Sequence, residues 1–561
     1  MFSTKPKQHL WEKSYPDGIS WHFEEKDATV HSLFERAIGI VPADPCIFFM
    51  GKEYSYRDID MMINRIAAKL QEMGIKKGDN IGLCLPNTPY FVAAYYAILK
   101  TGATVVNFNP LYTEEEINHQ VKDSNIKMMF TLDIASIYPK VEASLDTTQL
   151  ETIVICPLAN ILPNFKKMAF KIFKSREISK PKSKDNILYF TDMIHHYMAP
   201  KPVKIDPKED IAVIQYTGGT TGIPKGAMLT HSNVLNNTKQ IKLWLGEDTH
   251  KEVFMAALPF FHVFAMAAVM NLGIATCSKL VLVPRFDLAD VLKLILKHKI
   301  TIFPAVPSIL SAINNSLLSR KFSLKSLKYI ISGGASLPLA VKREFEANTG
   351  AKIVEGYGLT ESSPVATCSP PNDSAKENSI GLPIPGTLVE IRDLEKNSKC
   401  VATGEKGEIF IKGPQIMKGY WKNQEATDKN IIKGWLKTGD IGHIDEDGFI
   451  FLTDRIKELI IINGYNVYPR IIEEAFYKHE AVAEVSVIGV KDEEKGEVPK
   501  AFIALKQGHK VSEEELLAFA VSKLNPIEKP EYVEIRKSLP KTMIGKLSKK
   551  ELIQEEGLKN K

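Results

Sequence analysis

Apolar positions along the chain form two alternating patterns, namely short continuous runs and longer stretches with helical spacing. The runs at residues 81–85, 128–131, 152–156 and 211–215 are typical of buried strands. Between runs of this kind, residues 54–70 place their apolar side chains on one face of a helix. Strands that alternate with helices predict a largely parallel sheet with helices on both faces.

The last hundred or so residues show a different pattern. A helix is predicted from Ile471, and strands are predicted at residues 485–489 and 501–505. This order predicts a separate, small α+β domain. A chain of 561 residues is also too long for one hydrophobic core. We therefore predict a large α/β domain followed by a small α+β domain.

Residues 254–277 contain no Asp, Glu, Lys or Arg, and their length alone would suit a transmembrane helix. Pro259, His262 and Asn271 argue against a membrane span, as does the order of a strand-like run, a turn and a helix-like run. We predict a buried strand, a turn and a helix.

Residues 163–184 combine eight lysines and arginines with a single acid, Glu177. Phe165, Met168, Ile172 and Phe173 recur among them at helical spacing. A basic amphipathic segment of this kind can rest on an anionic membrane, but most charge runs form a solvated surface. The sequence leaves both alternatives open.

The overall composition excludes several classes. Lys and Arg number 72 against 67 Asp and Glu, and a net charge of +5 is too small for this length to indicate nucleic-acid binding. The six cysteines show no paired spacing, which favours a reducing compartment over a disulfide framework or a zinc site. The first residues contain no apolar core typical of a signal peptide. These features favour a cytoplasmic protein.

A glycine- and threonine-rich loop follows the strand at residues 211–215. Glycine lets the backbone turn and expose its N–H groups, while threonine hydroxyls and Lys225 add further donors and positive charge. The pattern predicts a phosphate-binding loop rather than a solvated turn. It is not a Walker A loop, because Gly226 rather than Ser or Thr follows Lys225. The loop residues are Thr217, Gly218, Gly219, Thr220, Thr221, Gly222 and Lys225.

Two further stretches carry candidate chemistry. In residues 355–361, Tyr357 offers an aromatic face for a purine, and Thr360 and Glu361 offer oxygen ligands to a hard cation such as Mg²⁺. Further on, Asp440 can accept hydrogen bonds from ribose hydroxyls and Arg455 can donate them. Each of these charges alone would more often belong to a surface ion pair.

These motifs together resemble the adenylate-forming superfamily of acyl-CoA synthetases, luciferases and peptide-synthetase adenylation domains. Residues 217–226 are similar to its AMP-binding signature, and residues 539–547 to its terminal catalytic motif. Residues 433–459 resemble the signature of the fatty acyl-CoA synthetases, and residues 10–18 the opening of bacterial long-chain fatty acid–CoA ligases. The resemblance extends from about Trp11 to Leu552.

The resemblance implies a large N-terminal multi-sheet α/β domain of the acyl-CoA synthetase type and a small mobile α+β C-terminal domain. It places a hinge at Lys457, and hence domains at residues 1–456 and 457–561. The implied activity is ATP-dependent ligation of a long-chain fatty acid to coenzyme A through an acyl-adenylate, with pyrophosphate and AMP released.

The resemblance also implies a role for individual residues. The catalytic residues would be Thr217, Lys225, Glu361 and Lys546, with Glu361 holding Mg²⁺. The ATP site would comprise Thr217, Gly218, Gly219, Thr220, Thr221, Gly222, Lys225, Gly334, Ala335, Glu355, Gly356, Tyr357, Gly358, Thr360, Asp440, Arg455, Lys457 and Lys546. The fatty acid would meet Phe260, His262, Gly333 and Gly334, and coenzyme A would meet Gly464, Tyr465 and Asn466.

Several alternatives share these motifs. They are an aryl- or medium-chain-acid CoA ligase, a luciferase-like oxygenase, and a non-catalytic fatty-acid-binding or uptake protein. An amino-acid-activating domain would carry an acid within residues 260–264, and none is present. Homodimers occur in the family, and residues 163–184 would permit peripheral contact with the inner face of the membrane.

Overall fold

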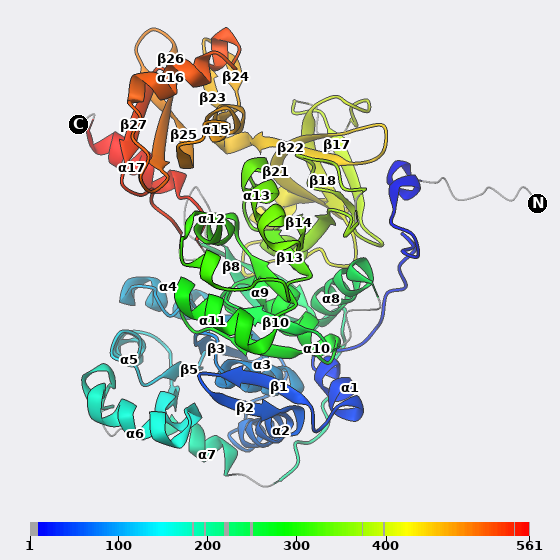
Figure 1. Cartoon of the computed structure of the whole chain (residues 1–561). Coiled ribbons are helices and arrows are strands. Elements are labelled where there is room, and N and C mark those ends of the chain that lie inside the picture. The colour runs from blue at the N-terminus through cyan, green and yellow to red at the C-terminus, as the bar shows by residue number, and fades with distance from the viewer. Residues whose placement is uncertain are drawn as a thin grey trace, which may run out of the picture.

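The computed structural model describes residues 9–181, 185–195, 198–217, 224–246, 251–372, 374–395, 399–542 and 545–559. A large α/β part contains most of the chain, and a smaller part, orange to red in Figure 1, lies against one end of it. The predicted combination of a large α/β part and a small α+β part is confirmed.

The first sheet of the large part has eight strands in the order β19-β9-β8-β4-β3-β5-β6-β7. Pairing is parallel from β8 to β7, and antiparallel between β8 and β9 and between β9 and β19. The runs predicted as buried strands form its centre. The bounds are β3 (Asn80–Cys84), β4 (Thr104–Asn107), β5 (Met128–Leu132), β6 (Thr152–Cys156), β7 (Ile187–Tyr189), β8 (Ile211–Thr217), β9 (Lys225–Thr230) and β19 (Gly419–Tyr420).

The second sheet has nine strands in the order β16-β15-β14-β13-β12-β10-β11-β1-β2. It is parallel from β14 to β1 and antiparallel at both ends. The bounds are β1 (Pro45–Phe49), β2 (Lys52–Ser55), β10 (Val253–Ala256), β11 (Lys279–Leu282), β12 (Ile302–Ala305), β13 (Tyr329–Gly333), β14 (Lys352–Gly358), β15 (Val365–Cys368) and β16 (Leu382–Pro383).

Helices cover both sheets, and one hydrophobic core of the large part extends through them. The predicted helix at residues 54–70 is α2, which Ser55 caps by accepting a hydrogen bond from the Asp58 N–H. The bounds are α1 (Ser32–Ile40), α2 (Tyr56–Glu72), α3 (Pro89–Lys100), α4 (Glu114–Ser124), α5 (Tyr138–Thr147), α6 (Asn164–Phe173), α7 (Phe190–Ile194), α8 (His231–Leu245), α11 (Leu288–His298), α12 (Pro307–Asn315), α13 (Leu339–Thr349) and α14 (Gln424–Asn430).

The apolar stretch at residues 254–277 forms the predicted strand, turn and helix. β10 is followed by α9 (Val263–Ala265), a π-helical turn at Met266–Asn271, and α10 (Leu272–Ala275). No pattern in the sequence predicted the π-helical turn. Among the residues that the structure describes, no helix is long and apolar enough to cross a membrane.

A third sheet contains β17 (Leu388–Arg392), β18 (Gly407–Lys412), β20 (Ile431–Ile432), β21 (Trp435–Ile444) and β22 (Ile450–Arg455). β21 and β22 form an antiparallel hairpin whose register sets Asp440 opposite Arg455. The hairpin therefore brings two predicted site residues together across a single pair of strands.

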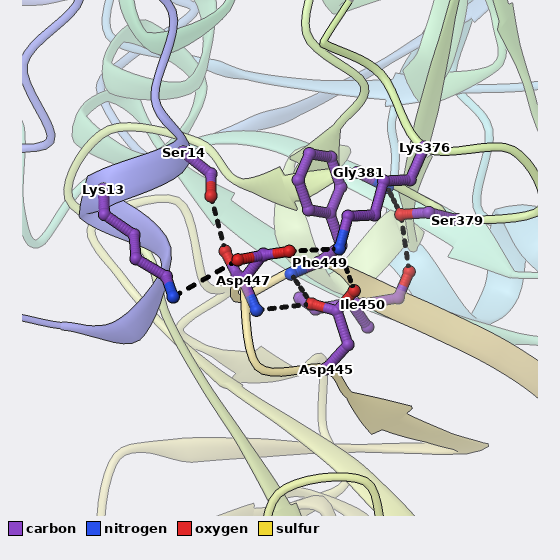
Figure 2. Close-up of polar contacts among 9 residues, drawn as sticks. All are labelled: Lys13, Ser14, Lys376, Ser379, Gly381, Asp445, Asp447, Phe449 and Ile450. Atoms are coloured by element: carbon purple, nitrogen blue, oxygen red, sulfur yellow. Dashed lines mark hydrogen bonds and ion pairs between the residues drawn. The ribbon is translucent and has the colours of Figure 1, made fainter.

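The first residues of the N-terminal arm, residues 9–31, lie against the turn of this hairpin. Figure 2 shows Lys13 paired with the Asp447 carboxylate at 3.2 Å, and the Ser14 hydroxyl donating to the Asp447 carbonyl at 2.8 Å. Gly448 in the turn has a φ of +84°, and a Cβ there would lie 2.3 Å from Trp11 Cα. The turn thus requires glycine both for its backbone conformation and for the close approach of the arm.

The small part has its own sheet and its own core. β23 (Ile460–Ile462), β24 (Tyr465–Val467), β25 (Val482–Asp492), β26 (Gly496–Leu505) and β27 (Tyr532–Arg536) form the sheet. The helices α15 (Pro469–Tyr477), α16 (Glu513–Val521) and α17 (Lys549–Lys559) accompany it. A separate cluster of buried residues, which includes Ile472, Phe476, Val487 and Ile503, makes this part an independent packing unit.

Candidate functional site

A cavity of about 310 Å³ lies where the large and small parts meet. The large part contributes the ends of β13 and β14 and the β21–β22 hairpin, and the small part contributes α15, β25 and the segment around Lys546. Parallel strands place their carboxyl ends at one edge of a sheet, where ligands of α/β proteins commonly bind. The cavity is therefore the candidate active site.

Backbone at the ends of two neighbouring strands forms one wall, in which Gly356 lines the cavity and Gly333 is buried. Gly333 at the end of β13 lies beside Gly356 of β14. A Cβ on Gly333 would lie 3.2 Å from the Gly356 carbonyl oxygen and 3.2 Å from the Phe264 ring. Gly334, with a φ of +85°, and Ala335 continue the wall. The wall is thus bare backbone, which a flat ligand can approach closely.

Glu355 lines the cavity beside these glycines. Its carboxylate accepts a hydrogen bond from the Leu337 N–H at 3.3 Å. Burial raises the pKa of Glu355 to about 6, and the charge of Arg470 partly opposes that rise. A carboxyl with such a pKa can change its protonation state near neutral pH.

Asp440, Tyr357 and Arg455 form a connected group in the cavity. The Tyr357 hydroxyl donates to Asp440 Oδ2 at 2.6 Å, and Arg455 Nε donates to Asp440 Oδ1 at 3.1 Å. Asp440 is buried, and burial raises its pKa while Arg455 opposes the rise. The sequence predicted all three residues in the site, but it did not predict the hydrogen bond between Tyr357 and Asp440.

Lys546 enters the cavity from the small part. Its side chain crosses Gly334, where a Cβ would lie 2.8 Å from Lys546 Cε. Burial and the neighbouring Arg455 lower the pKa of Lys546 to about 8, although Asp440 acts in the opposite direction. A tight turn presents this lysine: Gly545 has a φ of +82°, and its N–H donates to the Thr542 carbonyl at 2.8 Å.

A second, narrow cavity adjoins the first beyond Lys546, and His262 and Phe264 lie in its wall. His262 Nδ1 accepts a hydrogen bond from the Phe264 N–H at 3.3 Å, so a neutral ring carries its proton on Nε2. Burial and the charge of Lys546 lower the pKa of His262 to about 3. The imidazole is therefore a neutral hydrogen-bond donor at physiological pH.

Phe260, the other residue predicted in this block, is fully buried. Its ring packs 5.7 Å from that of Phe91, and its N–H donates to Asn87 at 2.8 Å. Phe264 is the phenylalanine beside His262 in the narrow cavity. The sequence analysis did not predict Phe264, which lies in the short helix α9, whereas Phe260 lies in the turn before it.

The two ends of the predicted phosphate-binding loop lie side by side. Thr217 ends β8 and pairs with Lys225, which begins β9. Lys225 is exposed, and its Nζ lies 5.3 Å from the centre of the Tyr420 ring. The predicted residues Gly218, Gly219, Thr220, Thr221 and Gly222 lie outside the described part of the chain.

Thr360 and Glu361 begin a short 3-10 turn after β14. Glu361 Oε1 accepts a hydrogen bond from the Tyr420 hydroxyl at 2.8 Å. Within the described ranges, no group of three or more His, Cys, Asp or Glu residues could hold a metal ion. A single carboxylate fits Mg²⁺, which commonly binds proteins through one or two carboxylates and substrate phosphates.

Tyr420 contacts both Lys225 and Glu361, and the sequence analysis missed it. The signal that could have revealed it is the aromatic pair Tyr420–Trp421 in an otherwise polar stretch at residues 418–430. Charged and polar stretches usually face water, so an aromatic pair within one indicates buried contacts.

The three residues predicted for coenzyme A lie elsewhere. Gly464, Tyr465 and Asn466 are exposed on the β23–β24 hairpin, and none of these described residues lines the cavity. Lys457 lies in a short turn at Ile456–Glu458 between β22 and β23. In this arrangement the small part presents Lys546, and not the hairpin, to the site.

A charged group that the sequence analysis did not predict connects the two parts behind Lys546. Arg470 of α15 donates through Nη1 to the Leu452 carbonyl at 2.7 Å, and its N–H donates to Asp454 Oδ2 at 3.0 Å. Lys549 lies 3.0 Å from Glu473 and 3.1 Å from Glu458, whose charges raise its pKa against the effect of burial. The Lys549 contacts lie within the small part, and the two Arg470 contacts join it to the large part in the orientation that places Lys546 in the cavity.

The chain is similar to known proteins over nearly its whole length. The family described as AMP-binding enzyme matches residues 34–421, and the AMP-binding enzyme C-terminal domain matches residues 471–546. A long-chain-fatty-acid–CoA ligase of Bacillus subtilis (strain 168) is 41% identical, with 99% of each chain covered. A ligase of the same name from Salmonella typhimurium (strain LT2) is 34% identical, with 97% of this chain and 98% of that protein covered.

Solved structures agree as well. ATP-bound MatB from Rhodopseudomonas palustris has a TM-score of 0.81 at 26% identity, with 94% of this chain and 99% of that chain covered. The two family matches follow one another along the chain, the two relatives are similar over nearly their whole length, and the fold is shared. The chain belongs to the AMP-binding enzyme family.

Proposed function

We propose that the protein ligates a long-chain fatty acid to coenzyme A at the expense of ATP, through an acyl-adenylate, and releases pyrophosphate and AMP. The observation that carries this proposal is the position of Lys546, which the small part places against Gly334 beside the Asp440–Arg455 pair. The name and the 41% identity of the Bacillus subtilis relative support the choice of acid and acceptor.

The chemistry explains why such a site is needed. A carboxylate is a poor acyl donor because its oxygen is a poor leaving group, and adenylation replaces that oxygen with AMP. Attack on the α-phosphate develops negative charge there and on the departing pyrophosphate. Preorganised donors and cations stabilise such charge most effectively in a site that excludes water.

The residues divide between binding and charge stabilisation. Tyr357, with the backbone of Gly333 to Ala335 and of Glu355 to Gly358, holds the purine. Asp440 and Arg455 bind the ribose. Thr217 and Lys225, at the two ends of the phosphate-binding loop, bind the phosphates. Lys546 neutralises the charge at the reacting phosphate. Thr360 and Glu361 would hold Mg²⁺, which supplies further neutralisation of phosphate charge when bound.

The fatty acid reaches this centre past His262 and the Gly333–Gly334 backbone. The neutral His262 donates from Nε2 to the acid oxygen, and Phe260 supports the pocket from behind. The narrow cavity lined by His262 and Phe264 begins the path of the acyl chain.

The second half-reaction requires a different arrangement. Gly464, Tyr465 and Asn466 must reach the cavity to bind coenzyme A, and they are exposed on the β23–β24 hairpin here. We place the domain boundary between residues 456 and 457, so that rotation about Lys457 withdraws Lys546 and brings in this hairpin. Assembly as a homodimer is an expectation from the resemblance alone, and sedimentation tests it.

The proposal is tested by supplying purified protein with ATP, Mg²⁺, coenzyme A and an equal mixture of straight-chain and aromatic acids. Mass spectrometry then identifies the thioesters, and long saturated or monounsaturated chains are expected to dominate. If aryl or medium-chain thioesters predominate, the proposed mechanism stands and the proposed long-chain substrate is wrong. AMP-linked acid without thioester would overturn coenzyme A as the acceptor, and neither product would favour a non-catalytic binding protein.

Helix α6 supports a second proposal, contact with an anionic membrane on its cytoplasmic side. Phe170 packs against the core, but four other large apolar side chains are exposed: 69% of Phe165, 65% of Met168, 62% of Ile172 and 84% of Phe173 is accessible to solvent. Basic residues surround them, and Glu177 is the acid of the segment. Such a helix can bury its apolar side chains among acyl chains while its lysines meet anionic headgroups.

Replacement of Phe165, Met168, Ile172 and Phe173 by alanine is expected to reduce binding to phosphatidylglycerol vesicles more than tenfold, because each large side chain contributes about 1.5–3 kcal/mol on burial. Sedimentation with vesicles measures the bound fraction. Leu317, which is 66% exposed elsewhere, provides the matched control Leu317→Ala, and binding should remain unchanged there. Equal binding by the fourfold variant and the wild type would contradict the proposal.

A further inference from the structure

Residues 417–422 join two motifs that lie far apart in the sequence. The Met417 N–H donates to the Glu361 carbonyl at 2.8 Å. Further along, Lys418 donates to the Met228 carbonyl at 2.9 Å, and Tyr420 of β19 pairs with Ala227 of β9. One short segment therefore connects the turn that carries Glu361 with the strand that begins at Lys225.

The Tyr420 side chain repeats this connection at the level of functional groups. Its hydroxyl donates to Glu361 Oε1 at 2.8 Å, and its ring lies 5.3 Å from Lys225 Nζ. One side chain thus contacts the proposed metal ligand and the proposed phosphate-binding lysine.

The backbone around Tyr420 is fixed from both sides. The Tyr420 N–H donates to Thr427 Oγ1 at 2.9 Å, and the Trp421 N–H donates to the Gly226 carbonyl at 2.7 Å. The Trp421 indole and the Lys422 ammonium both donate to the Asp123 carbonyl, at 3.0 Å and 2.8 Å. With its main chain held in this way and only 8% of the residue exposed, the ring has little freedom to move away from Lys225 and Glu361.

We propose that Tyr420 is a positioning residue for adenylation, which orients the Glu361 carboxylate through its hydroxyl and holds the Lys225 ammonium against its ring. The inference rests on the proposed function, in which Glu361 meets Mg²⁺ and Lys225 meets the phosphates of ATP. Carboxylates that bind metal ions are commonly held by a hydrogen bond of this kind. An ammonium ion is attracted to the face of an aromatic ring at this distance.

Two substitutions separate the two contacts. Tyr420→Phe removes the hydroxyl and retains the ring, whereas Tyr420→Leu removes both. Calorimetry measures the Kd of ATP in EDTA and the Mg²⁺ concentration that gives half of the full increase in ATP affinity. Neither measurement requires turnover.

Tyr420→Phe is expected to raise the half-maximal Mg²⁺ concentration about tenfold, with the Kd of ATP in EDTA unchanged. Tyr420→Leu is expected to show the same change in Mg²⁺ dependence and, in addition, a Kd in EDTA that is about threefold higher, because Lys225 loses its ring. Tyr138→Phe is the matched control, since the Tyr138 hydroxyl donates to Glu142 Oε1 at 3.2 Å on α5, outside the site.

The outcomes distinguish failure of this inference from failure of the proposed function. If Mg²⁺ does not change the ATP affinity of the wild-type protein, the proposed role of Glu361 is wrong, and the inference about Tyr420 fails with it. A wild-type response that Tyr420→Phe leaves unchanged would overturn the inference alone, even if thermal unfolding shows a lower Tm. In that case Tyr420 serves only packing.

Discussion

Lys546→Ala is expected to lower the rate of acyl-adenylate formation by about 10²–10³-fold, the usual effect of removing one preorganised group that stabilises charge in a transition state. Thioester formation from pre-formed acyl-adenylate should keep most of its rate. The reason is that the small part must move Lys546 away before the exposed Gly464–Asn466 hairpin can reach the cavity. Pyrophosphate exchange measures the first half-reaction, and release of AMP from acyl-adenylate measures the second.

The pH dependence provides a second test of Lys546. Its pKa of about 8 lies below the ordinary lysine value, so the ammonium is charged below pH 8 and loses its proton above it. The kcat/KM for adenylation, which reports groups of the free enzyme, should therefore fall as pH rises through about 8. Lys546→Arg should lack this decline because guanidinium stays charged.

The control for Lys546→Ala is Lys550→Ala, which removes an exposed lysine four residues further on. Both half-reactions should keep their wild-type rates in that variant. If Lys546→Ala lowers the rates of both half-reactions equally, the proposal that the small part adopts two arrangements is wrong.

Gly358→Ala is expected to destabilise the fold by about 2–3 kcal/mol, as overpacking of a tight site commonly does. A Cβ at this position would lie 1.8 Å from the Pro364 carbonyl oxygen and 2.8 Å from its carbon. These are backbone atoms, so the turn that carries Thr360 and Glu361 would have to shift. Urea unfolding should show the lower stability, and ATP affinity in Mg²⁺ should fall in the same variant.

Gly356→Ala is the matched control two residues earlier in β14. The atom nearest to its Cβ would be the Ser332 carbonyl oxygen at 3.9 Å, an ordinary contact. Its urea midpoint should lie close to that of the wild type. Equal destabilisation by the two substitutions would show that the strand rejects any side chain and that the clash with Pro364 is not the cause.

Local pattern explains which parts of the fold could be predicted. The runs that became β5 and β6 are continuous apolar segments, and α3 begins at Pro89 behind its cap Thr88. The site motifs were recognised by their resemblance to a family, and Asp440 and Arg455 meet because they lie on adjacent strands of one hairpin.

The unpredicted features depend on contacts between distant segments. β19 has only two residues and no periodicity of its own, and it becomes a strand because β9 offers a free edge. The aromatic pair Tyr420–Trp421 indicates buried contacts, but its partners Lys225 and Glu361 follow only from that pairing of distant strands. The orientation of the small part likewise depends on contacts such as Arg470 with Leu452, which leave no trace in the spacing of apolar residues.

The N-terminal arm has a consequence for how the chain is made. Ser14 and its partner Asp447 are 433 positions apart, so at about 5–20 residues per second the ribosome needs about 20–90 s to supply the second after the first. Throughout that interval Trp11 lacks the turn at Gly448 that covers it in the finished protein. A nascent chain therefore leaves Trp11 without this cover until the turn has been made, and a chain truncated before residue 447 never acquires it.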